Sequence, residues 1–159
     1  MRLDLDNQEI GETELAIDSP LSLELGEGSP EAVSLKGTLR IQDMESRILI
    51  NGDLNAAGEA TCARCLTGFP LAWPVPVVMM VLRNQDTDED DDSVIVVVHQ
   101  RGVADLEPGL RECTLLAYPQ TVVCREDCLG ICVTCGADLN EKKCDCRQEA
   151  TDPRWDALP

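Results

Sequence analysis

The sequence predicts an α+β fold, in which a mostly antiparallel β domain carries one packed helix and is followed by a cysteine-rich C-terminal segment. Three observations support this prediction. Apolar and polar residues alternate over much of residues 1–100, a helical repeat follows near residues 105–118, and eight of the nine cysteines form close pairs. We place the β-rich domain at residues 1–120 and the cysteine-rich segment at residues 121–159.

The predicted strands come first along the chain. Alternation is clearest over residues 21–25, 33–41 and 69–81, where the large apolar side chains fall on one parity. One face of each strand should therefore lie against a core. The dipeptide Asn51-Gly52 is compatible with a hairpin turn or with a bulge inside a longer strand, and the sequence leaves both open.

Residues 105–118 predict the helix. Asp105 can cap its start, and Pro108 suits its first turn. Gly109 weakens the helix, and Pro119 marks its end. The residues expected to form its buried stripe are Leu106, Leu110, Cys113 and Ala117, with Leu116 beside them.

Four close cysteine pairs are the strongest chemical signal in the chain. The pairs are Cys62 with Cys65, Cys124 with Cys128, Cys132 with Cys135, and Cys144 with Cys146. Two such pairs supply a tetrahedral four-cysteine shell, so eight sulfurs suffice for two zinc ions. A closed shell of sulfur is typical of structural zinc rather than catalytic zinc. Iron in an all-cysteine shell is the alternative metal.

The eight sulfurs can divide in two ways. In the first division, the last two pairs form a local site, and the first two pairs form a second site that joins a loop of the β-rich domain to the segment after the helix. In the other division, the second and third pairs share a metal, and the first pair joins the fourth. We favour the first division because it lets the C-terminal loop close locally.

The charge balance limits the possible partners. Thirty acidic residues against 13 basic ones give a formal net charge of −17, which argues against a broad basic face for nucleic acid. Four thiolates outweigh one Zn²⁺, so each filled site adds a further charge of −2. An RNA contact should therefore be a small cluster, and the candidates beside the cysteine pairs are Arg64, Arg125, Lys142, Lys143 and Arg147.

The expected compartment is the cytoplasm. Residues 1–18 carry charges throughout and lack the apolar core of a signal peptide. The longest apolar run, residues 75–82, contains Pro76 and is too short to span a membrane. In a cytoplasmic protein, closely spaced cysteines are more often metal ligands than disulfides.

Three segments carry a combined spacing that is specific to one family. They are residues 62–66 (CARCL), the helix region 105–119, and residues 124–140, which hold two cysteine pairs and end in Gly-Ala-Asp-Leu-Asn. With Cys144-Asp145-Cys146 and Asp152-Pro153-Arg154, they resemble the YceD family of large ribosomal RNA subunit accumulation proteins. The resemblance implies a metal-binding protein that supports accumulation of large-subunit (23S) ribosomal RNA, and we expect the chain to act as a non-enzymatic ribosome-biogenesis factor. Its implied partner is ribosomal RNA or a ribosome-assembly protein.

Two other functions are weighed against this one. The first is an acidic, zinc-stabilised adaptor that binds a basic protein, such as a ribosomal protein, because the chain is strongly acidic. The second is a thiol redox enzyme based on Cys62 and Cys65, but the βαβ context that such a motif requires is missing around this pair. The sequence leaves the oligomeric state open.

Overall fold

The computed structural model describes residues 1–5, 11–23, 31–44, 47–82, 95–97, 99–100 and 102–146. The chain divides into two compact units. The first unit comprises Met1–Ala60 and Pro70–Gln120, and the second comprises Thr61–Phe69 and Thr121–Pro159. The segment Thr61–Phe69, which the sequence analysis counted with the β-rich domain, is thus grouped with the cysteine-rich segment.

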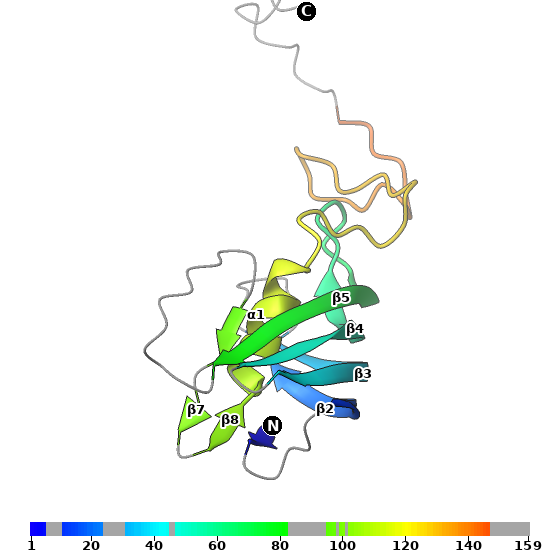
Figure 1. Cartoon of the computed structure of the whole chain (residues 1–159). Coiled ribbons are helices and arrows are strands. Elements are labelled where there is room, and N and C mark those ends of the chain that lie inside the picture. The colour runs from blue at the N-terminus through cyan, green and yellow to red at the C-terminus, as the bar shows by residue number, and fades with distance from the viewer. Residues whose placement is uncertain are drawn as a thin grey trace, which may run out of the picture. The chain divides into compact units, whose positions relative to one another are not determined.

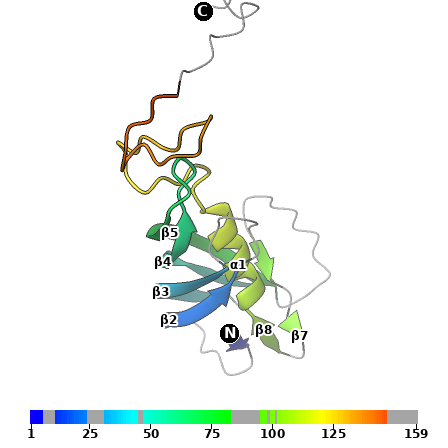
Figure 2. The same ribbon diagram turned by 180° about the vertical axis from the view of Figure 1, so that it is seen from behind.

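A five-stranded sheet, in the order β2-β3-β4-β5-β6, is the main element of the fold (Figures 1 and 2). Its strands are β2 (Glu12–Ser22), β3 (Ala32–Met44), β4 (Arg47–Thr61), β5 (Gly68–Leu82) and β6 (Ile95–Val97). β3 is antiparallel to both β2 and β4, whereas β6 is parallel to β5. The prediction of a mostly antiparallel sheet with one helix is confirmed.

A smaller antiparallel sheet has the order β1-β8-β7. Its strands are β1 (Arg2–Asp4), β7 (His99–Gln100) and β8 (Val103–Asp105). Among the described residues, no helix is both long enough and apolar enough to cross a membrane.

The alternation predicted for the long strands appears as alternating burial. In β3, for example, Leu35, Leu39 and Ile41 are buried, and the residues between them are mostly exposed. Asn51 and Gly52 form neither a turn nor a bulge, because they pair with β3 in an unbroken register inside β4. A Cβ atom on Gly52 would lie 2.5 Å from a backbone oxygen of β3, which explains the glycine.

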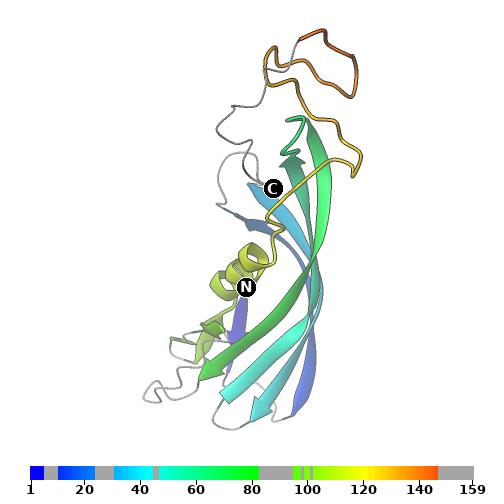
Figure 3. The ribbon, with the colours of Figure 1, turned by 90° about the horizontal axis from the view of Figure 1, so that it is seen from above.

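The helix α1 (Glu107–Leu116) lies against one face of the five-stranded sheet (Figure 3). Leu106, Leu110 and Cys113 are buried in the same core as the sheet residues. A Cβ atom on Gly109 would lie only 2.6 Å from the sulfur of Met79. Glycine at this position therefore allows the helix to approach the sheet closely.

The buried stripe of α1 differs from the predicted one at Leu116. This side chain is 75% exposed, whereas Thr114 is fully buried and donates its hydroxyl hydrogen to the Leu110 carbonyl at 2.6 Å. Thr114 lies four residues after Leu110 and continues its face, whereas Leu116 lies at the edge of the stripe, three residues after Cys113 but six after Leu110.

Candidate metal centres

The first four-cysteine cluster lies in the second unit and joins two parts of the chain that are far apart in sequence. It consists of Cys62, Cys65, Cys124 and Cys128, whose sulfurs all lie within 4.8 Å of one another. The Sγ–Sγ distance is 3.9 Å for Cys62 and Cys128 and 3.7 Å for Cys65 and Cys124. A tetrahedral zinc with Zn–S bonds of about 2.3 Å places its sulfurs about 3.8 Å apart. The donor set and its spacing therefore fit zinc.

The second cluster is local in sequence. It consists of Cys132, Cys135, Cys144 and Cys146, and these sulfurs also lie within 4.8 Å of one another. Its cysteines are more exposed than those of the first cluster. The eight sulfurs are thus grouped as in the first of the two predicted divisions, in which the last two cysteine pairs form a local site.

The two Cys-x2-Cys turns have the same backbone hydrogen bonds. The N–H of Leu66 donates to the Cys62 carbonyl at 2.9 Å, and the N–H of Gly136 donates to the Cys132 carbonyl at 2.8 Å. In both turns the first cysteine donates its own N–H to the carbonyl five residues later, at 2.9 Å. The residue after the second cysteine has a positive φ, 61° at Leu66 and 69° at Gly136. Each turn aims its two sulfurs at one point.

Each cluster combines a thiol of low pKa with one of high pKa. Burial raises the pKa of Cys62, but the backbone N–H groups around its sulfur outweigh burial and lower this pKa to about 6. Backbone N–H donors, that of Cys135 foremost, lower the pKa of Cys132 to about 6. Burial raises the pKa of Cys124 to about 12, and the hydrogen bond with the Cys135 sulfur raises that of Cys146 to about 12. A metal ion that binds four thiolates must displace protons from the high-pKa thiols.

Two of the five candidate RNA-binding residues hold the second unit together. Arg64 donates from Nη1 to the carbonyls of Glu126 and Cys128, at 3.1 and 3.0 Å. Arg125 donates from Nη2 to the side-chain oxygen of Asn140 at 2.8 Å and pairs with the carboxylate two residues later. These guanidinium groups already have protein partners.

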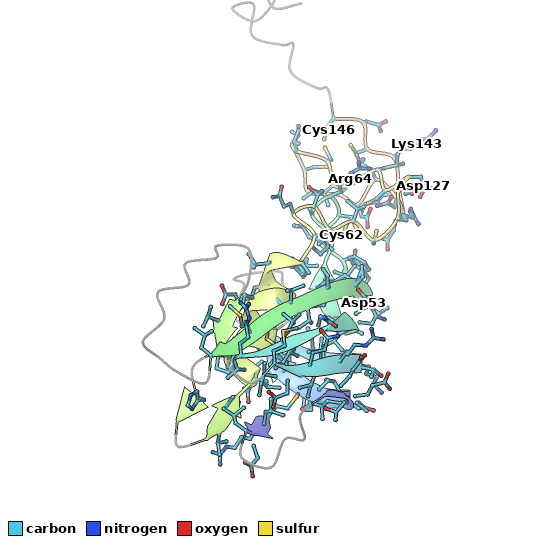
Figure 4. The ribbon with its side chains drawn as sticks, in the orientation of Figure 1. Asp53, Cys62, Arg64, Asp127, Lys143 and Cys146 are labelled. Atoms are coloured by element: carbon cyan, nitrogen blue, oxygen red, sulfur yellow. The ribbon has the colours of Figure 1, made fainter. Side chains whose placement is uncertain are left out.

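Lys142 and Lys143 differ from these arginines. Both are exposed, and neither forms an ion pair with another described residue. Figure 4 labels Lys143 and Cys146 in the second cluster's segment and Cys62 and Arg64 in the first cluster's loop. Arg147, the fifth candidate, lies outside the described residues.

In the described part of the second unit, basic and acidic side chains are nearly equal in number. This part contains four basic residues and five acidic residues, in a chain that has 13 and 30. The two zinc sites, when filled, add a further −2 each, so a negatively charged ligand still meets net negative charge at this segment and its contact depends on the nearest basic side chains.

Sequence analysis missed a contact made by Asn140. This residue lies between the cysteines of the second cluster, yet its side-chain amide donates to the sulfur of Cys128 in the first cluster, with Nδ2 and Sγ 3.5 Å apart. The only signal was its position in a short turn before Cys144. No spacing rule relates a turn residue of one cluster to a ligand of another.

Comparison with known proteins gives one family. Residues 50–159 match the family model described as "Large ribosomal RNA subunit accumulation protein YceD". The match covers both cysteine clusters and the helix α1. No solved structure gives a significant match.

The similar proteins include mycobacterial and plant sequences. A protein of Mycobacterium tuberculosis, described as uncharacterized, is 34% identical over 125 residues, which are 76% of this chain and 58% of the relative. One of Mycobacterium leprae is 28% identical over 102 residues, or 64% of this chain and 47% of the relative. An Arabidopsis thaliana protein, described as "Large ribosomal RNA subunit accumulation protein YCED homolog 1, chloroplastic", is 37% identical over 54 residues, or 34% of this chain and 17% of the relative. The chain thus spans at most 58% of the length of these relatives.

Proposed function

Because the chain belongs to the YceD family of large ribosomal RNA subunit accumulation proteins, we propose that it is a non-enzymatic ribosome-biogenesis factor that acts in the cytoplasm. In this role it supports accumulation of the large-subunit (23S) ribosomal RNA. The proposal is supported by the family match over residues 50–159 and by the name of the chloroplast relative.

The observation that carries the proposal is the pair of four-cysteine clusters. Each offers four sulfur donors, and zinc bound by four cysteines has no open position for a substrate. We infer that the eight cysteines hold two structural zinc ions. When bound, zinc supplies the cross-links that a short segment without its own large core needs. The chain's residues then present a fixed surface rather than a reaction centre.

We propose that the RNA contact centres on Lys142 and Lys143. Both ammonium groups are exposed and without ion pairs among the described residues. Zinc knuckles with a few basic residues bind single-stranded RNA. Binding should be weak and should fall with salt, with a logarithmic slope of roughly −0.7 for each phosphate contacted.

The alternative is an acidic adaptor that binds a basic ribosomal protein. The net charge of −17 favours it, since opposite charges steer association between proteins. In this reading the zinc sites stabilise the chain in the same way. Only the partner differs.

The deciding experiment combines a cellular and a binding measurement. Cells that lack the protein should accumulate less 23S ribosomal RNA, and the wild-type gene should restore it. The Lys142→Glu/Lys143→Glu variant should bind two zinc ions, fail to bind single-stranded ribosomal RNA segments, and fail to restore 23S levels. If the wild type binds no RNA and both the wild type and this variant capture basic ribosomal proteins, the adaptor is the correct function, because the added carboxylates favour attraction to a basic partner. Unchanged 23S levels in the deletion strain would contradict both.

A further inference from the structure

The side-chain amide of Asn140 lies between the two four-cysteine clusters. Asn140 belongs to the loop between Cys135 and Cys144, which are both in the second cluster. Its Nδ2 donates to the Cys128 sulfur of the first cluster at 3.5 Å and to Asp138 Oδ1 at 2.7 Å. Its Oδ1 accepts from the Leu129 N–H at 2.9 Å. One side chain therefore contacts a ligand of the first cluster from within the second.

The partners of the amide fix its orientation. Oδ1 faces two donors, the Leu129 N–H and Nη2 of Arg125, at 2.9 and 2.8 Å. Nδ2 faces the carboxylate of Asp138 and the sulfur of Cys128, which both accept. If the amide were flipped, its NH₂ group would face the N–H donors of Leu129 and Arg125, and its oxygen would face the carboxylate of Asp138. The N–H that points at Cys128 thus follows from four contacts together.

The backbone supports the same connection. Cys128 of the first cluster and Cys132 of the second are separated by only three residues. Within this short segment, Gly130 accepts the N–H of Leu139 at 2.9 Å, and Ile131 donates to the Arg64 carbonyl at 3.1 Å. The first hydrogen bond fixes the segment to the loop of Asn140, and the second fixes it to the first cluster's turn. Backbone hydrogen bonds therefore join the two clusters alongside the side chain of Asn140.

We propose that the two metal centres load cooperatively and that Asn140 is the positioning residue that couples them. This inference rests on the proposed zinc sites. A metal at the second centre fixes Cys135 and Cys144, which flank the loop of Asn140, and so holds its amide against Cys128. A thiolate that accepts an N–H hydrogen bond is a better-stabilised metal ligand, and such outer contacts are worth about 10- to 100-fold in metal affinity. By linkage, loading the first centre favours the second by the same factor.

Zinc titration of the purified chain against a chelator tests the proposal. The variant Cys135→Ser/Cys146→Ser reports the affinity of the first centre alone, and Cys65→Ser/Cys124→Ser reports that of the second alone. In the wild type, the overall association constant for loading both centres should be about tenfold larger than the product of the two single-centre association constants. We define the coupling ratio as the overall association constant divided by the product of the two single-centre association constants. When the same three measurements are made with Asn140→Ala added to each chain, this coupling ratio should be near one.

Two further variants separate the amide contact from loss of folding. Asn140→Asp keeps an oxygen for Leu129 and Arg125 but turns an acceptor toward Cys128, so it should abolish coupling as Asn140→Ala does. Asn55→Ala, on β4 in the first unit, removes an equivalent amide from an exposed site and should leave coupling unchanged.

The possible outcomes are distinct. The coupling would be overturned if the wild-type chain bound two zinc ions with a coupling ratio near one. It would also be overturned if the Asn140→Ala chain kept the tenfold coupling ratio. Both results would leave the zinc sites in place. A wild-type chain that binds fewer than two zinc ions would overturn the metal sites on which the coupling rests. Neither result depends on ribosomal RNA, so the proposed cellular role is tested separately, by the measurement of 23S ribosomal RNA levels.

Discussion

The basic side chains of the second unit differ in whether they bind oxygen atoms of the unit itself. Arg64 and Arg125 donate to oxygen atoms of the unit itself, whereas Lys142 and Lys143 are exposed and without ion pairs among the described residues. All four are basic residues beside cysteines, so the sequence could identify the group but not divide it. The division depends on which carbonyl groups the fold brings within reach of each side chain.

We expect Arg64→Ala to weaken the first metal centre more than the second. The change leaves the Glu126 and Cys128 carbonyls without the guanidinium donor that holds their loop. The zinc affinity of the first centre should fall by about tenfold, as is usual for outer-shell contacts. Chelator competition measures the effect, and Lys143→Ala is the matched control because its ammonium group is exposed. Equal affinities for both variants would contradict the bracing role.

At the scale of elements, the buried face of each long strand and the position of the helix could be predicted from the sequence, because both depend on local periodicity. The continuation of β4 through Asn51 and Gly52 could not, because a turn signal is overridden here by pairing with β3. The exposure of Leu116 could have been anticipated, since it lies off the helix face that Leu106 and Leu110 share. The parallel pairing of β5 with β6 has no local signal at all.

Gly109→Ala should destabilise the first unit by about 1 kcal/mol, against the usual preference for alanine in helices. Alanine gains up to about 1 kcal/mol of helix propensity. Its Cβ, however, would lie 2.6 Å from Met79 Sδ and 3.1 Å from Val97 Cγ2, and overpacking of a core costs roughly 1–3 kcal/mol. Urea unfolding followed by circular dichroism measures the difference, with Glu112→Ala on the exposed side of α1 as the control. A more stable Gly109→Ala chain would show that the helix can move away from the sheet.

The start of α1 should respond to acid. Asp105 accepts the N–H of Glu107 at 3.1 Å, and this hydrogen bond is the main cause that lowers the pKa of its carboxyl. A carboxyl with a lowered folded-state pKa stabilises the fold above its unfolded pKa of about 3.9, and this contribution is lost as pH falls through the folded pKa. Asp105 precedes the N-cap residue, Leu106, so Asp105→Ala removes this hydrogen bond and the ion pair with the N-terminal amine rather than a cap, and it should cost about 1 kcal/mol at neutral pH.

Urea titrations at several pH values check this expectation. The difference in unfolding free energy between wild type and Asp105→Ala should stay constant from neutral pH down to about pH 5 and shrink below about pH 4. A difference that grows on acidification would show that the carboxylate is not the stabilising form.

At the scale of the whole molecule, the sheet core and the metal clusters use different residues. Among the described residues, the core of the first unit includes Cys113 but none of the eight clustered cysteines. Local spacing was enough to favour the correct grouping of the sulfurs. It was not enough to find the link through Asn140, which needs the three-dimensional path of the segment between Cys128 and Cys132.

Removal of metal should therefore affect the two units unequally. Elemental analysis should find two zinc ions per chain before treatment with a strong chelator and none after it. Amide hydrogen exchange should then rise at Cys132, Gly136 and Leu139, whose N–H groups are held by the cluster turns, while the amides of β3 stay protected. Exchange that rises together in β3 and the cluster turns would mean that the chain unfolds as one body.

The long separation within the first cluster has a consequence for the order of events during synthesis. Cys65 and Cys124 lie 59 residues apart in sequence. At roughly 5–20 residues per second, the ribosome takes about 3–12 s to make the intervening chain. For that interval, Cys62 and Cys65 lack the other two sulfurs of their cluster, those of Cys124 and Cys128. The nascent chain thus carries two bare thiols while its sheet is still being made, and its protection from oxidation or from a wrong metal must come from outside the cluster.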